Sequence, residues 1–187
     1  MLIAFSGLKG SGKDTAAQVL INEYEFTKVA FADAVREMAL VIDPYVSLEL
    51  RDQDMLRLSE IVESKGWDWA KREISEVRRL LQVIGTEAGR MLFGPNVWID
   101  LLLKRFPDLA DPDTRYVVTD CRFENEAEFV QSLHGDICWV ERPGVVSDGH
   151  ASETDVVKKY ATKILVNDET IEELQEDVRF MMFLRGF

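Results

Sequence analysis

Basic residues are scarce in this sequence. The 187-residue chain contains 22 Lys and Arg against 34 Asp and Glu, which gives a formal net charge of −12. A surface this acidic repels DNA, RNA and anionic lipid, so the composition argues against a general nucleic-acid-binding protein. Any phosphate group that the protein binds must therefore be held by a local concentration of positive groups.

Long apolar runs and cysteines are also few. No run approaches the ~20 apolar residues of a membrane-spanning helix. The apolar stretch 1–7 has no basic residues before it turns at Gly7, so we expect neither a membrane anchor nor a signal peptide. Cys121 and Cys138 lie in separate apolar stretches, which favours buried thiols over a disulfide framework. We therefore expect a cytoplasmic protein.

Several catalytic patterns are missing as well. The sequence has no Ser/His/Asp arrangement, no zinc-ligand spacing and no Asn-Lys-x-Asp guanine signature. Its composition of 47% hydrophobic and 30% charged residues is typical of a folded protein. The length fits one domain over residues 1–187, and the charged, helix-like stretch in its middle predicts a helical excursion at about 45–110.

Short apolar runs alternate with helical patterns along the chain. Strands are expected at 2–6, 28–32, 115–120, 136–141 and 163–166. Helices are expected at 75–84, ending at Gly85, at 96–106, at 124–133, and after a capping box at Thr170, with Ile171, Leu174, Val178 and Met181 pointing inward. The alternation predicts an α/β fold: a mainly parallel sheet of about five strands, helices on both faces, and ligands at the carboxyl ends of the strands.

A glycine-rich loop follows the first expected strand. Gly7-x-x-x-x-Gly12-Lys13 has the Walker A spacing between a strand and a helix. Glycines let backbone N–H groups curl around a phosphate, the helix start adds its dipole, and Lys13 adds a charge. The dinucleotide-binding alternative fails because its third glycine would fall on Thr15. The other alternative is a tight turn with an incidental lysine.

The residue after the lysine departs from the usual motif. Asp14 stands where Ser or Thr usually binds Mg²⁺, and Thr15 comes one place later. Asp14 is therefore interpreted as a magnesium ligand, directly or through water, or as a residue that orients a phosphate. The alternative is that it only compensates the helix dipole. Asp120 ends an apolar strand, as a Walker B acid does, and completes the candidate metal set.

A second set of polar residues suggests another phosphate site. Arg78, Gln82 and Thr86 lie at i, i+4 and i+8 of one helix, with Arg79 adjacent. This stripe suits a phosphate and a base, or it is an ordinary solvated helix face. Arg122 follows Asp120 at the same strand end, and Glu126 comes one turn later. Trp98 is either part of the core or a stacking platform.

Together these segments resemble the deoxynucleoside monophosphate kinases of large tailed bacteriophages. The matching stretches are 6–15, 77–82 with 85–87, Trp98 and the apolar residues after it, 118–122 with Glu126, 140–144 with His150, and 166–168. They run in family order over nearly the whole chain, and Lys-Asp-Thr is the usual loop ending in this family. The resemblance implies a three-layer P-loop NTPase fold and Mg²⁺-dependent transfer of a phosphoryl group from ATP to deoxynucleoside monophosphates, commonly by a homodimer.

The same resemblance implies roles for individual residues. The ATP-binding set would be Gly10, Ser11, Gly12, Lys13, Asp14, Thr15, Arg142, Asn167 and Asp168. The substrate-binding set would be Lys9, Asp33, Arg78, Arg79, Gln82, Gly85, Thr86, Trp98, Arg122, Glu126 and His150. Lys13, Asp14, Asp120 and Arg122 would carry catalysis. Arg142 and His150 lie where a mobile lid is expected, at about 142–160, and Asn167 and Asp168 lie where the adenine edge is approached.

One region departs from the family. Residues 45–71 match poorly, so the range of accepted bases is not transferred. The alternatives are a P-loop kinase for another small phosphorylated metabolite and a nucleotide-binding module without catalysis. Neither a nucleic-acid polymer nor a membrane is an expected partner.

Overall fold

The computed structural model describes residues 1–47, 55–146 and 155–187. They form two compact units: unit 1 comprises Met1–Phe31 and Leu102–Phe187, and unit 2 comprises Ala32–Leu101. Each unit is described by itself. Unit 2 starts before residue 45 and ends before residue 110, so its bounds differ from those of the helical excursion predicted at about 45–110. That residues 1–187 form a single domain stays a prediction. No helix within the described ranges is long and apolar enough to cross a membrane.

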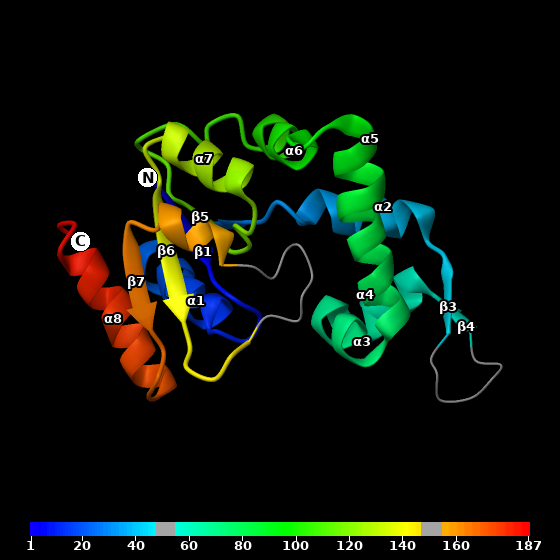
Figure 1. Ribbon diagram of the computed structural model, residues 1–187, viewed down its shortest axis with the longest axis horizontal. Coiled ribbons are helices and arrows are strands. Elements are labelled where there is room, and N and C mark those ends of the chain that lie inside the picture. Colours follow the sequence, from blue (N-terminus) through cyan, green and yellow to red (C-terminus); the bar gives the residue numbers. More distant parts are fainter. Residues whose placement is uncertain (48–54, 147–154) are drawn as a thin grey trace. The chain divides into compact units, whose positions relative to one another are not determined.

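A five-stranded sheet forms the centre of unit 1 (Figure 1). Its strands are β1 (Leu2–Ser6), β2 (Thr27–Val29), β5 (Tyr116–Val118), β6 (Asp136–Glu141) and β7 (Lys163–Val166). They pair in the order β2-β5-β1-β6-β7, and every pairing is parallel. This confirms the expected sheet, although β2 and β5 are shorter than expected. Because β1 is central, the loop after it leaves from the middle of the carboxyl edge.

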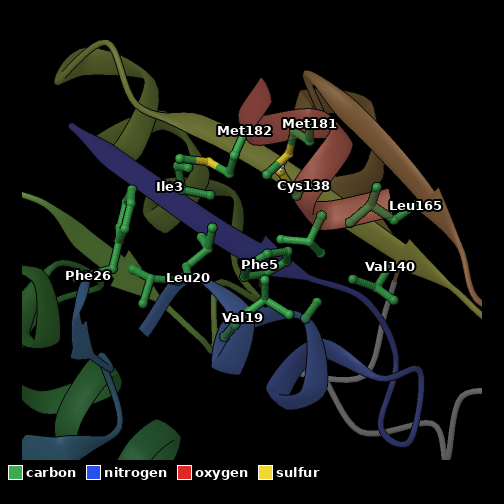
Figure 2. Close-up of a cluster of buried hydrophobic side chains, with 14 of the residues drawn as sticks. Ile3, Phe5, Val19, Leu20, Phe26, Cys138, Val140, Leu165, Met181 and Met182 are labelled. Atoms are coloured by element: carbon green, nitrogen blue, oxygen red, sulfur yellow. Dashed lines mark hydrogen bonds between the residues drawn. The ribbon is translucent and has the colours of Figure 1, made fainter. Parts of the chain in front are cut away.

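Helices α1 (Lys13–Tyr24) and α8 (Ile171–Phe183) pack against each other and share one core with the sheet. Figure 2 shows Ile3 and Phe5 of β1 in a cluster with Leu20 of α1 and Met182 of α8. Successive strand residues face opposite sides, which leaves Leu2 and Ala4 for the other face. Helix α7 (Glu124–Ser132) packs against β1 and β6 there.

The final helix departs from expectation at one position. Its capping box is present, since the side chain of Thr170 accepts a hydrogen bond from the Glu173 N–H. Leu174, Val178 and Met181 are buried as predicted, but Ile171 is 60% exposed. The prediction for Ile171 was wrong because the first residue of the helix lies beyond the end of the core.

Unit 2 is mostly helical. Its elements are α2 (Asp33–Ile42), β3 (Tyr45–Ser47), β4 (Met55–Arg57), α3 (Leu58–Glu73), α4 (Ser75–Gln82), the π-helical segment η1 (Val83–Arg90) and α5 (Met91–Phe93); α6 (Val97–Arg105) begins in unit 2 and ends in unit 1. Unit 1 also contains a short 3₁₀ helix, η2 (Val156–Tyr160). Strands β3 and β4 pair in antiparallel fashion, whereas the sequence predicted only helical structure there.

The helix expected at 75–84 does not end at Gly85. Elements α4, η1 and α5 follow one another without a break, and Figure 1 shows α4 and α5 as one continuous helix. Gly85 lies inside it and is not among the glycines with positive φ. The helix ends at Gly94, whose φ of 98° and ψ of 158° lie in a region that residues with side chains rarely adopt.

Candidate nucleotide-binding site

The glycine loop connects β1 to α1 in unit 1. Gly7, Gly10 and Gly12 have φ values of 139°, 81° and 106°, which side-chain-bearing residues rarely adopt. A Cβ on Gly7 would lie only 2.3 Å from the carbonyl oxygen of Val140. The glycines are therefore required both by the backbone conformation and by the close approach of β6. The loop delivers the chain to Lys13, where α1 begins.

Lys13 is folded back over this loop. Its Nζ donates hydrogen bonds of 2.7 Å to the carbonyl oxygens of Gly7 and of Leu8, and the residue is buried. The loop thus holds a positive charge beside the backbone amides at the start of α1. In a protein of net charge −12, this is the local concentration of positive groups that a phosphate needs.

Ser11 provides an independent sign of a ligand. Its hydroxyl is buried and has no hydrogen-bond partner among the described residues. Leaving such a group unsatisfied costs about 1–3 kcal/mol. Because the hydroxyl belongs to the glycine loop, an oxygen of a bound phosphate is a suitable missing partner.

Asn167 holds the other side of the loop. It follows β7, is buried, and donates a 2.8 Å hydrogen bond from Nδ2 to the carbonyl oxygen of Ser11. A Cβ on Gly12 would lie 2.6 Å from the same Nδ2. The sequence predicted Asn167 and Asp168 beside adenine. The structure adds a contact of Asn167 with the glycine loop, and Asp168 and Asn167 line the same hollow.

The candidate metal ligands lie at the same edge of unit 1. Asp14 is in the first turn of α1 with its side chain 84% exposed, and one of its oxygens is 3.8 Å from Nζ of Lys28. Asp120 follows β5, and its Oδ1 accepts a 2.9 Å hydrogen bond from the Phe31 N–H. Thr15 is next to Asp14 in α1. Carboxylate and hydroxyl oxygens are hard ligands of the kind that Mg²⁺ prefers.

No group of three or more His, Cys, Asp or Glu in the described part of the chain could hold a metal by itself. Asp14, Asp120 and Thr15 offer two carboxylates and a hydroxyl. Such a set fits Mg²⁺, which is commonly bound by one or two carboxylates together with substrate phosphates and water.

Lys28 was not among the residues predicted from the sequence. The signal that could have found it is a basic residue in a strand of an acidic protein, on the strand after the glycine loop.

The side chain of Glu126 holds the backbone at Arg122 by hydrogen bonds. Glu126 Oε2 accepts hydrogen bonds from the N–H groups of Arg122, at 2.7 Å, and of Phe123, at 3.1 Å. Glu126 is only 2% exposed, and its carboxylate caps the N-terminus of α7 by accepting from the backbone N–H of Phe123. It therefore fixes the turn that presents Arg122, which is half-buried. Its predicted contact with substrate stays a prediction.

The two thiols offer no nucleophile to this site. Both cysteines are free and buried, as the sequence predicted. Burial raises the pKa of Cys121 well above its ordinary value and raises the pKa of Cys138 to about 12. At neutral pH both therefore stay protonated. Cys121 contributes through its backbone, because its carbonyl accepts a 2.6 Å hydrogen bond from Ser6 Oγ.

Several predicted substrate residues lie in unit 2. Arg78 and Gln82 on α4 and Thr86 on η1 are half-buried, and Arg79 is exposed. Asp33 begins α2 and pairs with Arg36 at 3.0 Å. Their contacts with a substrate stay predictions.

From the sequence, Trp98 is either part of the core or a stacking platform. It is 2% exposed, and its Nε1 donates a 2.8 Å hydrogen bond to the carbonyl oxygen of Gly85. The structure favours the core interpretation for its position in unit 2. Of the predicted lid at 142–160, Arg142 is exposed after β6, whereas His150 lies outside the described residues.

Comparison with known proteins identifies relatives for this set of features. The sequence profile of a family described as deoxynucleotide monophosphate kinase matches residues 45–178. A protein of Acanthamoeba polyphaga mimivirus is 31% identical over 190 aligned positions, which cover 95% of this chain and 94% of that protein. The deoxynucleoside-5'-monophosphate kinase of Escherichia phage T5 is 27% identical, with 89% of each chain covered.

Solved structures support the fold. The dephospho-CoA kinase of Campylobacter jejuni is similar with a TM-score of 0.50 and 13% identity, covering 97% of this chain and 94% of its own. A Thermus thermophilus protein gives a TM-score of 0.52 at 17% identity, covering 97% and 96%. At these identities the likeness concerns the fold alone.

Proposed function

The chain belongs to the deoxynucleotide monophosphate kinase family, and we propose that it transfers the terminal phosphoryl group of ATP to deoxynucleoside monophosphates, giving ADP and the diphosphate. The observation that carries this proposal is the glycine loop, into which Lys13 is hydrogen-bonded and whose Ser11 hydroxyl is buried with no partner in the described part of the chain. The loop provides the phosphate-binding half of a kinase, and the family indicates the acceptor.

In this mechanism the donor phosphates bind along residues 9–15. The loop amides and Lys13 meet the charge that develops on the transferred group, while binding aligns donor and acceptor for in-line transfer. Asp14, Thr15 and Asp120 would hold Mg²⁺. When bound, the ion neutralises negative charge on the donor phosphates. Asn167 keeps the loop in shape, and Arg142 and Asp168 complete the proposed ATP set.

The acceptor is proposed to bind through arginines. Arg122 and Arg78 take the monophosphate, because charge-assisted hydrogen bonds from a guanidinium suit phosphate oxygens. The remaining residues of the proposed acceptor set are Lys9, Asp33, Arg79, Gln82, Gly85, Thr86, Glu126 and His150, whereas Trp98 is buried beside Gly85 and is not proposed to touch the acceptor. Action in the cytoplasm and a homodimeric state belong to the same proposal and rest on the family resemblance.

The test is acceptor-dependent ADP formation. The purified protein with ATP and Mg²⁺ is assayed with dGMP, dTMP, dAMP and dCMP, and with GMP and phosphomevalonate for comparison. We expect at least one deoxynucleotide to stimulate ADP release strongly. Lys13→Ala serves as the control and should abolish the stimulation.

Two outcomes would contradict the proposal. Stimulation by phosphomevalonate alone would assign the protein to another small phosphorylated metabolite. ATP binding without stimulation by any acceptor would indicate a nucleotide-binding module that does not catalyse transfer.

A further inference from the structure

The helix that carries Arg78, Gln82 and Thr86 changes its hydrogen-bonding pattern partway along. At the end of α4 the Val83 N–H bonds to the carbonyl of Arg79, four residues back. At the end of η1 the Met91 N–H bonds to the carbonyl of Thr86, five residues back. Such π-helical segments are rare and occur frequently at functional sites.

The wider π turn changes which residues share a face. In an α-helix, residues four apart are offset by about 40° around the axis, so Thr86 would stand about 80° away from Arg78. A π-helix contains more residues per turn, so each residue turns less. The step from Gln82 to Thr86 then falls short of a full circle instead of exceeding it. Thr86 is brought back toward the line of Arg78.

Trp98 packs against this segment at two points. Its Nε1 donates to the carbonyl of Gly85, inside η1, at 2.8 Å. Its ring occupies the space beside Gly89, where an added Cβ would lie 2.2 Å from Cζ2 and 2.8 Å from the carbonyl oxygen of Ile84. The ring is therefore seated against η1 only because residue 89 has no side chain. Its hydrogen bond ties α6 to the π-helical turn.

We propose that the π-helical turn of η1 aligns Thr86 with Arg78 and Gln82 on one acceptor-binding face, and that Trp98 is the positioning residue that holds this turn. The inference rests on the proposed function, because it assigns these three side chains to the acceptor. Trp98 therefore affects acceptor binding indirectly, by fixing the position of Thr86. The acceptor side of the reaction should therefore depend on an indole N–H that is itself buried.

The test is a double-mutant cycle between Trp98 and Thr86. Thr86→Ala in the otherwise unchanged protein should raise the KM for the deoxynucleotide roughly fivefold, the effect of one hydrogen bond, and leave the KM for ATP unchanged. Trp98→Phe keeps an aromatic ring and removes the N–H, and should raise the same KM at least as much. Adding Thr86→Ala to Trp98→Phe should then change nothing more, because Thr86 is already displaced.

Trp139→Phe is the matched control. Trp139 is also buried, but its Nε1 has no hydrogen-bond partner among the described residues. The same chemical change there should leave both KM values unaltered. Fully additive effects of Trp98→Phe and Thr86→Ala would overturn the inference, because a merely structural role for Trp98 predicts additivity.

A measurement without turnover covers the case in which Trp98→Phe is poorly active. Amide hydrogen exchange of the folded variant should be faster in residues 83–90 and unchanged in residues 75–82. Unchanged exchange in both segments would also overturn the inference. A wild-type protein that no deoxynucleotide stimulates would instead contradict the proposed function, so the two failures are distinguishable.

Discussion

Asp14 places a carboxylate where the phosphates of ATP are proposed to bind. Like charges repel there unless a cation lies between them, and Lys28, at 3.8 Å, is the nearby positive side chain. Asp14→Asn keeps the shape and removes the charge. We expect kcat to fall at least tenfold, about 1.4 kcal/mol of barrier, and ATP affinity without magnesium to stay equal or become tighter. Steady-state kinetics and ATP titrations with and without Mg²⁺ measure both.

Helix-dipole compensation makes a different prediction for the same variant. An acid in the first turn of a helix contributes about 0.3–1 kcal/mol to stability through the dipole. Normal kcat with a lowered melting temperature would therefore make Asp14 structural and leave magnesium to Thr15 or Asp120. Lys28→Met is the matched control, because it removes the charge that pairs with Asp14 while every residue of the proposed metal set stays in place.

Substituting Arg122 distinguishes acceptor binding from ATP binding in the proposed reaction. Its backbone N–H is held by Glu126 independently of its side chain, so Arg122→Ala should preserve the turn. Losing a charge-assisted hydrogen bond to phosphate costs about 1.5–3 kcal/mol, so the acceptor KM should rise roughly 10- to 100-fold. ATP affinity, measured by equilibrium binding, should be nearly unchanged. A fall in ATP affinity with an unmoved acceptor KM would mean that Arg122 serves the donor.

At the scale of elements, the two glycines of η1 predict opposite effects on stability. A Cβ on Gly89 meets the ring of Trp98 at 2.2 Å, whereas a Cβ on Gly85 meets Val35 at an ordinary 3.8 Å. Gly89→Ala should destabilise by about 1–3 kcal/mol through overpacking. Gly85→Ala should stabilise by about 0.5–1 kcal/mol, because alanine favours the helix. Urea unfolding of both variants measures the difference, and equal effects would contradict the packing described around Trp98.

The elements of unit 1 could be predicted from the sequence because each carries a local signal. Strands β1, β6 and β7 match their predicted bounds, since short apolar runs there end at a glycine, a proline or a capping box. The glycine loop was found for the same reason: its spacing is local and its backbone demands glycine. Glu126 was selected from its spacing, but its role in capping α7 depends on which backbone amides lie beside it.

The features that the sequence did not predict depend on contacts between residues that are distant along the chain. Gly85 resembles a helix terminator until Trp98, thirteen residues later, is seen to bond to its carbonyl. The hairpin of β3 and β4 consists of three-residue strands with no apolar alternation, so only their pairing reveals them. The burial of Trp98 likewise follows from the absence of a side chain at Gly89, which no periodicity reports.

For the whole protein, the cysteines offer a measure of how often unit 1 opens. Both are fully buried, and burial raises the pKa of each thiol, with that of Cys138 reaching about 12. At pH 8 the folded protein therefore has almost no reactive thiolate, and a thiol reagent should label it only after unfolding. ATP at one hundred times its Kd should slow labelling about 100-fold, because it stabilises the folded state by about 2.7 kcal/mol.

The labelling is followed by mass spectrometry, and a sample in urea provides the control in which both thiols react at once. Rapid labelling of the native protein at a rate independent of ATP would contradict this prediction. It would mean that the thiols are reached by local fluctuations without opening the nucleotide-binding core.

The hydrogen bond from Asn167 to Ser11 joins residues 156 positions apart, and β1 pairs with strands from the later part of the chain. During translation the glycine loop therefore leaves the ribosome well before β6, β7 and Asn167, which support it. A chain that stops before Asn167 has the glycine-loop sequence without the structure that shapes it. Such a truncated chain should consume no ATP.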